Sequence, residues 1–156
     1  MKNSGFTLIE LVVTVLIVAI LATGALPIIQ LTVQRNKETE LKQSLRQIRE
    51  AIDLYKKTAD GGKIKKTLDQ TGYPTSLELL EKGVVDQTDP KGRLIKFIRK
   101  IPRDPMNNNQ ELKPEETWEK RSYASDASAP VEGVDVYDIH SRSTKKAIDG
   151  SLYNSW

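Results

Sequence analysis

The hydrophobic residues of this chain form two successive patterns in its N-terminal part. From Leu11 to Ile29 the residues are uncharged and mostly aliphatic. A helix of this length spans ~28 Å, about the thickness of the hydrocarbon layer of a bilayer. The rest of the chain is too polar to cover so continuous an apolar surface inside a soluble core. The run therefore predicts a transmembrane helix.

Beyond Gln34 the pattern becomes that of an amphipathic helix. Apolar residues recur at alternating steps of four and three and so share one face, while charged residues such as Glu38, Lys42 and Arg49 cover the other faces. This stripe consists of Leu41, Leu45, Ile48, Ile52 and Tyr55. Asp60-Gly61-Gly62 then supplies a stop. We expect one helix from about residue 6 to residue 58, ~80 Å long, with an apolar first half and an amphipathic second half.

The remaining residues, 61–156, predict a small folded head. Thr75–Gly83 has the polar start, acidic first turn and glycine stop of a short helix. Residues 118–124, 134–139 and 151–156 fit strands, and in the second of these Val134 and Val136 are expected to share one face. The predicted fold class is α+β, with a small antiparallel sheet packed on the amphipathic half of the long helix.

Composition and charge narrow the function classes. The net charge is only +3, with acidic and basic residues mixed, so we expect no nucleic-acid partner. The densest basic stretch, residues 91–100, is interpreted as a solvated face, with an acidic neighbouring subunit as the alternative contact. The chain has no cysteine and a single histidine, His140, for which we expect a surface or packing role. A phosphate loop and a nucleophile elbow are also missing, so we expect neither enzyme activity nor a catalytic cofactor.

The only ionisable side chain between Phe6 and Gln34 is Glu10. A carboxylate in a membrane helix costs roughly 2.5 kcal/mol or more at the bilayer centre, so it normally has a function and a partner. The polar leader, residues 1–5, precedes the apolar run directly, whereas a secretory signal has its cleavage site after the apolar core. Lys2 favours a cytoplasmic leader, with the distal part of the chain on the far side of the membrane.

The segment Gly5-Phe6-Thr7-Leu8-Ile9-Glu10-Leu11 resembles the class III signal of type IV pilins and type II secretion pseudopilins. The resemblance implies that a membrane aspartyl peptidase, the prepilin peptidase, cuts after Gly5 and N-methylates the new N-terminal Phe6. It also implies that Glu10 pairs with the Phe6 amine of a neighbouring subunit in a filament. Pro27 predicts a kink or opening of the helix, and the resemblance implies that the helix melts there on assembly.

Later segments are similar to the major pseudopilin of type II secretion systems, notably Tyr73-Pro74-Thr75, residues 98–105 and 136–141, and Trp156. With this pilin-like fold the chain divides into a cleaved leader (1–5), a transmembrane and polymerisation helix (6–34), an amphipathic continuation (35–60) and a periplasmic head (61–156). The resemblance implies a single-pass inner-membrane protein that becomes a filament across the periplasm. Its implied partners are copies of itself, minor pseudopilins, the prepilin peptidase, an inner-membrane assembly platform and, before assembly, membrane lipid.

Many members of this family bind one structural calcium ion in the C-terminal loop. The corresponding loop here, residues 141–150, contains Asp149 as its only acidic residue and three basic ones. Calcium takes six to eight oxygen ligands with several carboxylates. We therefore expect Asp149-Gly150 to form a turn, with Asp149 as a calcium ligand being the alternative.

The resulting functional hypothesis is a structural subunit of a pseudopilus that drives the export of folded proteins. A type IV pilus subunit for adhesion, motility or DNA uptake is the first alternative. The absence of cysteine weighs against it, because many such pilins close a C-terminal loop with a disulfide. The second alternative is a membrane-anchored periplasmic binding or enzyme module whose leader is never cut.

Overall fold

A computed structural model describes the chain except residues 1–4, 68 and 127 and the side chains of residues 24–27. The chain forms two compact units, one up to Asn36 and one from Lys37 to Trp156. Helix α1 (Leu8–Asp60) contributes residues to both units. The predicted long helix is thus confirmed, with an ending two residues later than expected. The helix includes position 27, but the side chain of Pro27, and with it the predicted assembly role, lies outside the described residues.

The first unit has an apolar surface. Every described residue from Gly5 to Thr23 is exposed, and so are residues 28–33. Leu8 and Ile20 expose 82% and 65% of their surface. So large an exposed apolar surface is unfavourable in water and indicates contact with lipid or with other apolar helices. By length and composition α1 contains one segment able to cross a membrane.

The second unit is built on the amphipathic part of α1. The whole predicted stripe is buried, and Leu41 and Ile48 are fully enclosed. The head supplies the other half of the core with Leu77, Leu80, Ile98, Ile101, Trp118 and Ile139. Each such large aliphatic side chain contributes about 1.5–3 kcal/mol on full burial, so this stripe attaches the head to the helix.

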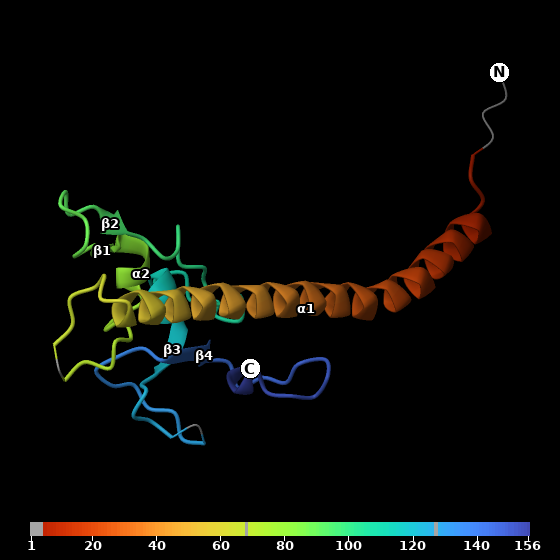
Figure 1. Ribbon diagram of the computed structural model, residues 1–156. Helices are drawn as coiled ribbons and strands as arrows, with labels where there is room; N and C mark the ends of the chain where they lie inside the picture. Colours follow the sequence, from red (N-terminus) through yellow and green to blue (C-terminus); the bar gives the residue numbers. More distant parts are fainter. Residues whose placement is uncertain (1–4, 68, 127) are drawn as a thin grey trace. The chain divides into compact units, whose positions relative to one another are not determined.

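Two small antiparallel sheets complete the head. Strand β1 (Val84–Val85) pairs with β2 (Leu94–Ile95). Strand β3 (Trp118–Arg121) pairs with β4 (Asp138–Ser141), with Trp118 opposite Ser141 and Arg121 opposite Asp138. In the view of Figure 1, β3 and β4 lie on the opposite side of α1 from β1 and β2. The α+β class with a small antiparallel sheet on the helix is confirmed.

Several predicted element bounds were wrong. The helix expected over 75–82 is only α2 (Glu78–Lys82). The residues before it form bends and a turn, and the carbonyl of Pro74 accepts the amide of Val136 at 2.8 Å, which ties this segment to the loop before β4. The glycine stop is confirmed by Gly83, whose φ is +86°. The strand expected over 151–156 is instead the short 3₁₀-helix η2 (Tyr153–Ser155).

The two central strands are also displaced from their predicted bounds. β3 ends at Arg121 and β4 begins only at Asp138, so residues 134–137 are not a strand. Val134 is accordingly 82% exposed, whereas Val136 is buried, and the predicted shared face does not exist. A strand does not form here because the side chain of Asp135 is buried in the head, where it accepts hydrogen bonds from other loops.

The segment Ile101-Pro102-Arg103-Asp104-Pro105 is hydrogen-bonded to β3 and β4, and its Ile101 and Asp104 side chains are buried. The Asp104 carboxylate accepts the Ser141 hydroxyl at 2.6 Å and the Met106 amide at 2.8 Å. The indole of Trp118 donates to the carbonyl of Pro102 at 2.9 Å. These hydrogen bonds connect β3 and β4 to the segment that precedes the 3₁₀-helix η1 (Pro114–Thr117) and satisfy its buried polar groups.

A second buried carboxylate, Asp135, organises the loops before β4. It accepts hydrogen bonds from the Ser122 hydroxyl at 2.6 Å, from the Tyr123 amide at 3.0 Å and from the hydroxyl of Thr71. Burial by itself raises the pKa of Asp135, but these hydrogen bonds outweigh it and lower the pKa below its usual value.

We expect Asp135→Asn to destabilise the head by about 2 kcal/mol at neutral pH, because hydrogen bonds to a charged acceptor are lost. The NH₂ group of asparagine would also face the groups that donate to Asp135 in the wild type. A carboxyl group with a lowered pKa in the folded state stabilises the fold above its unfolded pKa of about 4 and loses this contribution as the pH falls further. The difference in unfolding free energy between wild type and variant is thus expected to shrink below about pH 4.

Denaturant unfolding at several pH values measures this difference. Glu119→Gln, on an exposed side chain of β3, is the matched control and is expected to stay within about 0.5 kcal/mol of wild type. A difference for Asp135→Asn that does not depend on pH would contradict the role assigned to its charge.

Candidate assembly site

The beginning of α1 is organised by Thr7. Its carbonyl accepts the amide of Leu11 at 3.2 Å, the first bond of the helix. Its hydroxyl oxygen accepts the amide of Glu10 at 3.4 Å, and the same hydroxyl lies 3.5 Å from a carboxylate oxygen of Glu10. These long contacts are one half of a capping box, in which a threonine ahead of the first turn satisfies an amide that has no partner within the helix.

The cap fixes the position of Glu10. As the third residue of α1 it lies in the first turn, where the positive end of the helix dipole favours a carboxylate. Glu10 is exposed, and the neighbouring Phe6 is 83% exposed. Among the described residues of the first unit that precede Arg35, Glu10 is the only ionisable side chain. A carboxylate is thus presented on an aliphatic surface, available to a cation from another molecule.

The remaining predicted site residues lie elsewhere. Gly5 is described and exposed, directly before Phe6. Asp149 lies in the C-terminal loop of the head, where its carboxylate accepts the amide and hydroxyl of Ser151 at 2.9 and 2.6 Å, which is the predicted turn. His140 lies half-buried on β4, with its Nδ1 3.3 Å from the carbonyl of Ser141. Neither residue belongs to the site at the start of α1.

Three residues with structural roles, Thr7, Glu38 and Arg49, were not predicted from the sequence. The role of Thr7 could have been predicted, because Thr7-Leu8-Ile9-Glu10 matches the capping-box spacing of a threonine followed three residues later by a glutamate. Glu38 and Arg49 were interpreted only as charges on the exposed faces of the helix. Both instead contact the head, and no local signal distinguishes them from their solvated neighbours.

We expect Thr7→Ala to loosen the first turn of α1. Loss of a threonine cap costs about 1 kcal/mol, so amide exchange at Glu10 is expected to become roughly fivefold faster. Hydrogen exchange of the full chain in detergent micelles measures this rate. Thr14→Ala is the control, because the Thr14 hydroxyl bonds the carbonyl of Leu11 at 2.9 Å within the helix and caps no amide. Equal exchange rates at Glu10 in the two variants would exclude a capping role.

Comparison with known proteins places these features in a family. Residues 1–26 match the model of the prokaryotic N-terminal methylation motif. The type II secretion system core protein G of Vibrio cholerae is 31% identical over 111 residues, which cover 69% of this chain and 68% of the relative. The proteins of the same name from Pseudomonas aeruginosa and Escherichia coli K12 are 33% and 30% identical, and the matches cover 70% and 72% of their lengths. No solved structure matches the chain.

The match to the methylation motif covers Gly5, Phe6 and Thr7, which directly precede α1, and Glu10 in its first turn. The relatives extend the similarity over about two thirds of the chain, well beyond the motif. The chain therefore belongs to the family of the type II secretion system core protein G, the major pseudopilins.

Proposed function

We propose that this chain is cut after Gly5, N-methylated at Phe6 and polymerised through α1 into a pseudopilus. The observation that carries this proposal is the exposed aliphatic surface of the first unit with Glu10 as its one carboxylate. Such a surface requires lipid before assembly and other apolar helices afterwards.

Charge pairing supplies the specificity that apolar packing lacks. Lipid tails solvate an aliphatic helix about as well as a neighbouring helix does, so burial alone gives little reason to leave the bilayer. Cleavage before Phe6 creates an α-amino group that stays charged after methylation. When this amine meets Glu10 of another subunit, two poorly solvated charges neutralise each other, and the pair fixes the axial register of the two helices.

The name shared by the relatives, type II secretion system core protein G, supports a place for this chain in such a system. In the proposed pathway α1 anchors the subunit in the inner membrane, with the head in the periplasm. An assembly platform then extracts the subunit into a growing filament together with minor pseudopilins, and the filament pushes folded proteins outward. We propose a structural role without catalysis for this chain.

Electron microscopy of the assembled protein, combined with mass spectrometry of its N-terminus, tests this proposal. The expected results are filaments with a core of bundled helices and a mature chain that begins with methylated Phe6. A functional protein that remains monomeric, or that retains residues 1–5, would contradict polymerisation and support the uncleaved membrane-anchored module instead. Deletion of the gene is expected to abolish protein export, whereas loss of twitching with intact export would indicate a pilus subunit.

A further inference from the structure

The C-terminal loop of the head, which here comprises residues 142–156 after β4, is attached to α1 by three charged side chains of that helix, Glu38, Lys42 and Arg49, which we call the helix clasp. Glu38 accepts the amide of Ile148 at 2.9 Å and the hydroxyl of Tyr153 at 2.8 Å through one carboxylate oxygen. These two donors flank the turn at Asp149-Gly150. Glu38 therefore holds both sides of this turn against the helix.

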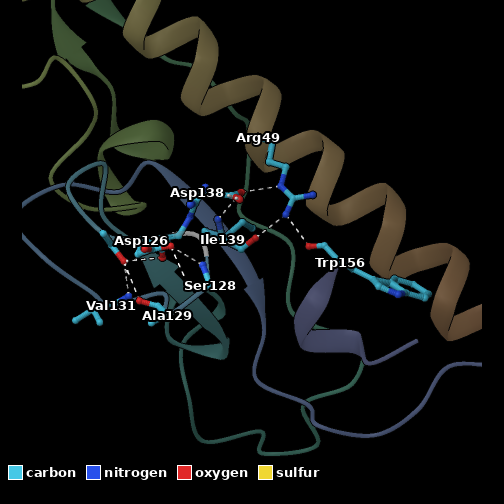
Figure 2. A network of polar contacts seen from close by, with 10 residues as sticks. Arg49, Asp126, Ser128, Ala129, Val131, Asp138, Ile139 and Trp156 are labelled. Carbon is cyan, nitrogen blue, oxygen red and sulfur yellow. Dashed lines mark hydrogen bonds and ion pairs between the residues drawn. The ribbon is translucent and has the colours of Figure 1, made fainter. Parts of the chain in front are cut away.

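Arg49 lies about three turns further along α1, on nearly the same side of the helix as Glu38. Its guanidinium donates to the Asp138 carboxylate at 2.7 Å, to the carbonyl of Ile139 at 3.0 Å and to the carbonyl of Trp156 at 2.7 Å. Figure 2 shows the hydrogen bonds from Arg49 on α1 to Asp138 and Ile139 of β4 and to Trp156. One planar guanidinium group thus connects the strand before the loop to Trp156 at the far end of the loop.

Lys42 completes the clasp between these two residues. Its ammonium group lies 4.4 Å from the centre of the Trp156 ring, within the range of a cation–π interaction. The Trp156 indole also donates to the Ser151 hydroxyl at 2.6 Å and packs edge-on against Tyr153. The loop is thereby fixed to α1 at its turn, at its aromatic pair and at Trp156.

The same loop does not fit the calcium ion that the family resemblance implies. Its own acidic residue, Asp149, directs a carboxylate oxygen at the amide and hydroxyl of Ser151, and Glu38 directs one at two donors. Arg142, Lys145 and Lys146 add positive charge to the loop. In the part of the chain that the structure describes, no three His, Cys, Asp or Glu residues are grouped to hold a metal ion. Calcium needs six to eight oxygens, and these carboxylates already serve hydrogen-bond donors.

We propose that the helix clasp takes the place of a structural calcium ion in this protein, so that the C-terminal loop is ordered without metal. The charged groups of α1 provide the cross-links between loop and head that a cation provides by binding several loop oxygens at once. The fold of the head is then independent of the calcium concentration around it.

The first test is thermal unfolding of the full chain as a monomer in detergent micelles, followed by tryptophan fluorescence, in a calcium chelator and in excess calcium chloride. Trp118 and Trp156 both belong to the head and report its unfolding. The expected result is the same melting temperature in both solutions. A melting temperature that falls in chelator and recovers with calcium would overturn the proposal.

The second test asks whether the clasp holds the loop. In Glu38→Ala the Ile148 amide loses a charged acceptor, and we expect its hydrogen exchange to become about tenfold faster or more. Glu40→Ala, on an exposed side chain of the same helix, is the matched control and is expected to leave that rate unchanged. Unchanged exchange at Ile148 in Glu38→Ala would overturn the proposal. Both tests use unassembled protein, so their outcome does not depend on whether the chain polymerises.

Discussion

Replacing Glu10 by leucine is expected to abolish filaments while leaving cleavage after Gly5 intact. Leucine removes the cost of placing a carboxylate in lipid, about 2.5–3.5 kcal/mol at the centre of a helix, so membrane insertion is not impaired. In the proposed filament, the variant would leave the Phe6 amine of each neighbouring subunit without a partner in an apolar environment. Breaking a buried ion pair in this way costs about 3–5 kcal/mol, which weakens each junction by a factor on the order of a hundred or more.

The measurement combines electron microscopy of filaments with the mass of the membrane-bound subunit. Glu10→Gln keeps the shape and a hydrogen-bond acceptor but removes the charge, so it separates pairing of charges from simple polarity. The control for added hydrophobicity is Thr14→Leu, which is expected to assemble. Thr14 is also exposed and lies one turn after Glu10 on the same face of α1. Normal filaments from Glu10→Leu would remove the basis of the proposed assembly mechanism.

Replacing Gly5 by valine is expected to block processing altogether. A methyl group added at Gly5 meets no atom of the described residues within 4 Å. In the described part of the chain, packing therefore leaves room for a side chain at this position. Any requirement for it comes from the peptidase, whose cleavage site a branched side chain next to the scissile bond is expected to obstruct.

Mass spectrometry of the membrane fraction distinguishes the two products, since the uncut chain is heavier by residues 1–5. The Gly5→Val protein also lacks the free Phe6 amine, so we expect no filaments from it, although Glu10 is present. Thr14→Leu again serves as the control and is expected to be cut. If Gly5→Val were processed and assembled like wild type, the assignment of the cleavage site would be wrong.

The two variants fail at different steps, which makes them informative together. Glu10→Leu is expected to accumulate as a cut monomer, and Gly5→Val as an uncut one. A mixture of the two variants is not expected to restore long filaments. In the proposed filament each junction needs an amine from one subunit and a carboxylate from the next, and neither variant provides both.

Much of α1 and its site could be predicted from the sequence because the relevant interactions are local. A helix satisfies its backbone within four residues, so the apolar run, the stripe from Leu41 to Tyr55 and the stop at Asp60-Gly61 are readable from spacing alone. The capping pair Thr7 and Glu10 is likewise three residues apart. The motif residues Gly5, Phe6 and Glu10 are also contiguous, so they too needed no tertiary information.

The head depended on contacts between distant residues. Thr71 bonds Asp135 across 64 positions, and this contact, not β propensity, moves the start of β4 to Asp138. Glu38 reaches Ile148 across 110 positions, and Arg49 reaches Trp156 across 107. On a helical wheel both side chains resemble ordinary solvated charges. The apolar helix segment, its carboxylate and the buried stripe could thus be predicted from spacing along the chain, whereas the strand bounds and the helix clasp depend on contacts formed in the folded head. The physical reason is that a helix is specified by neighbours in the chain, while a sheet edge or a clasped loop is specified by partners that folding brings together.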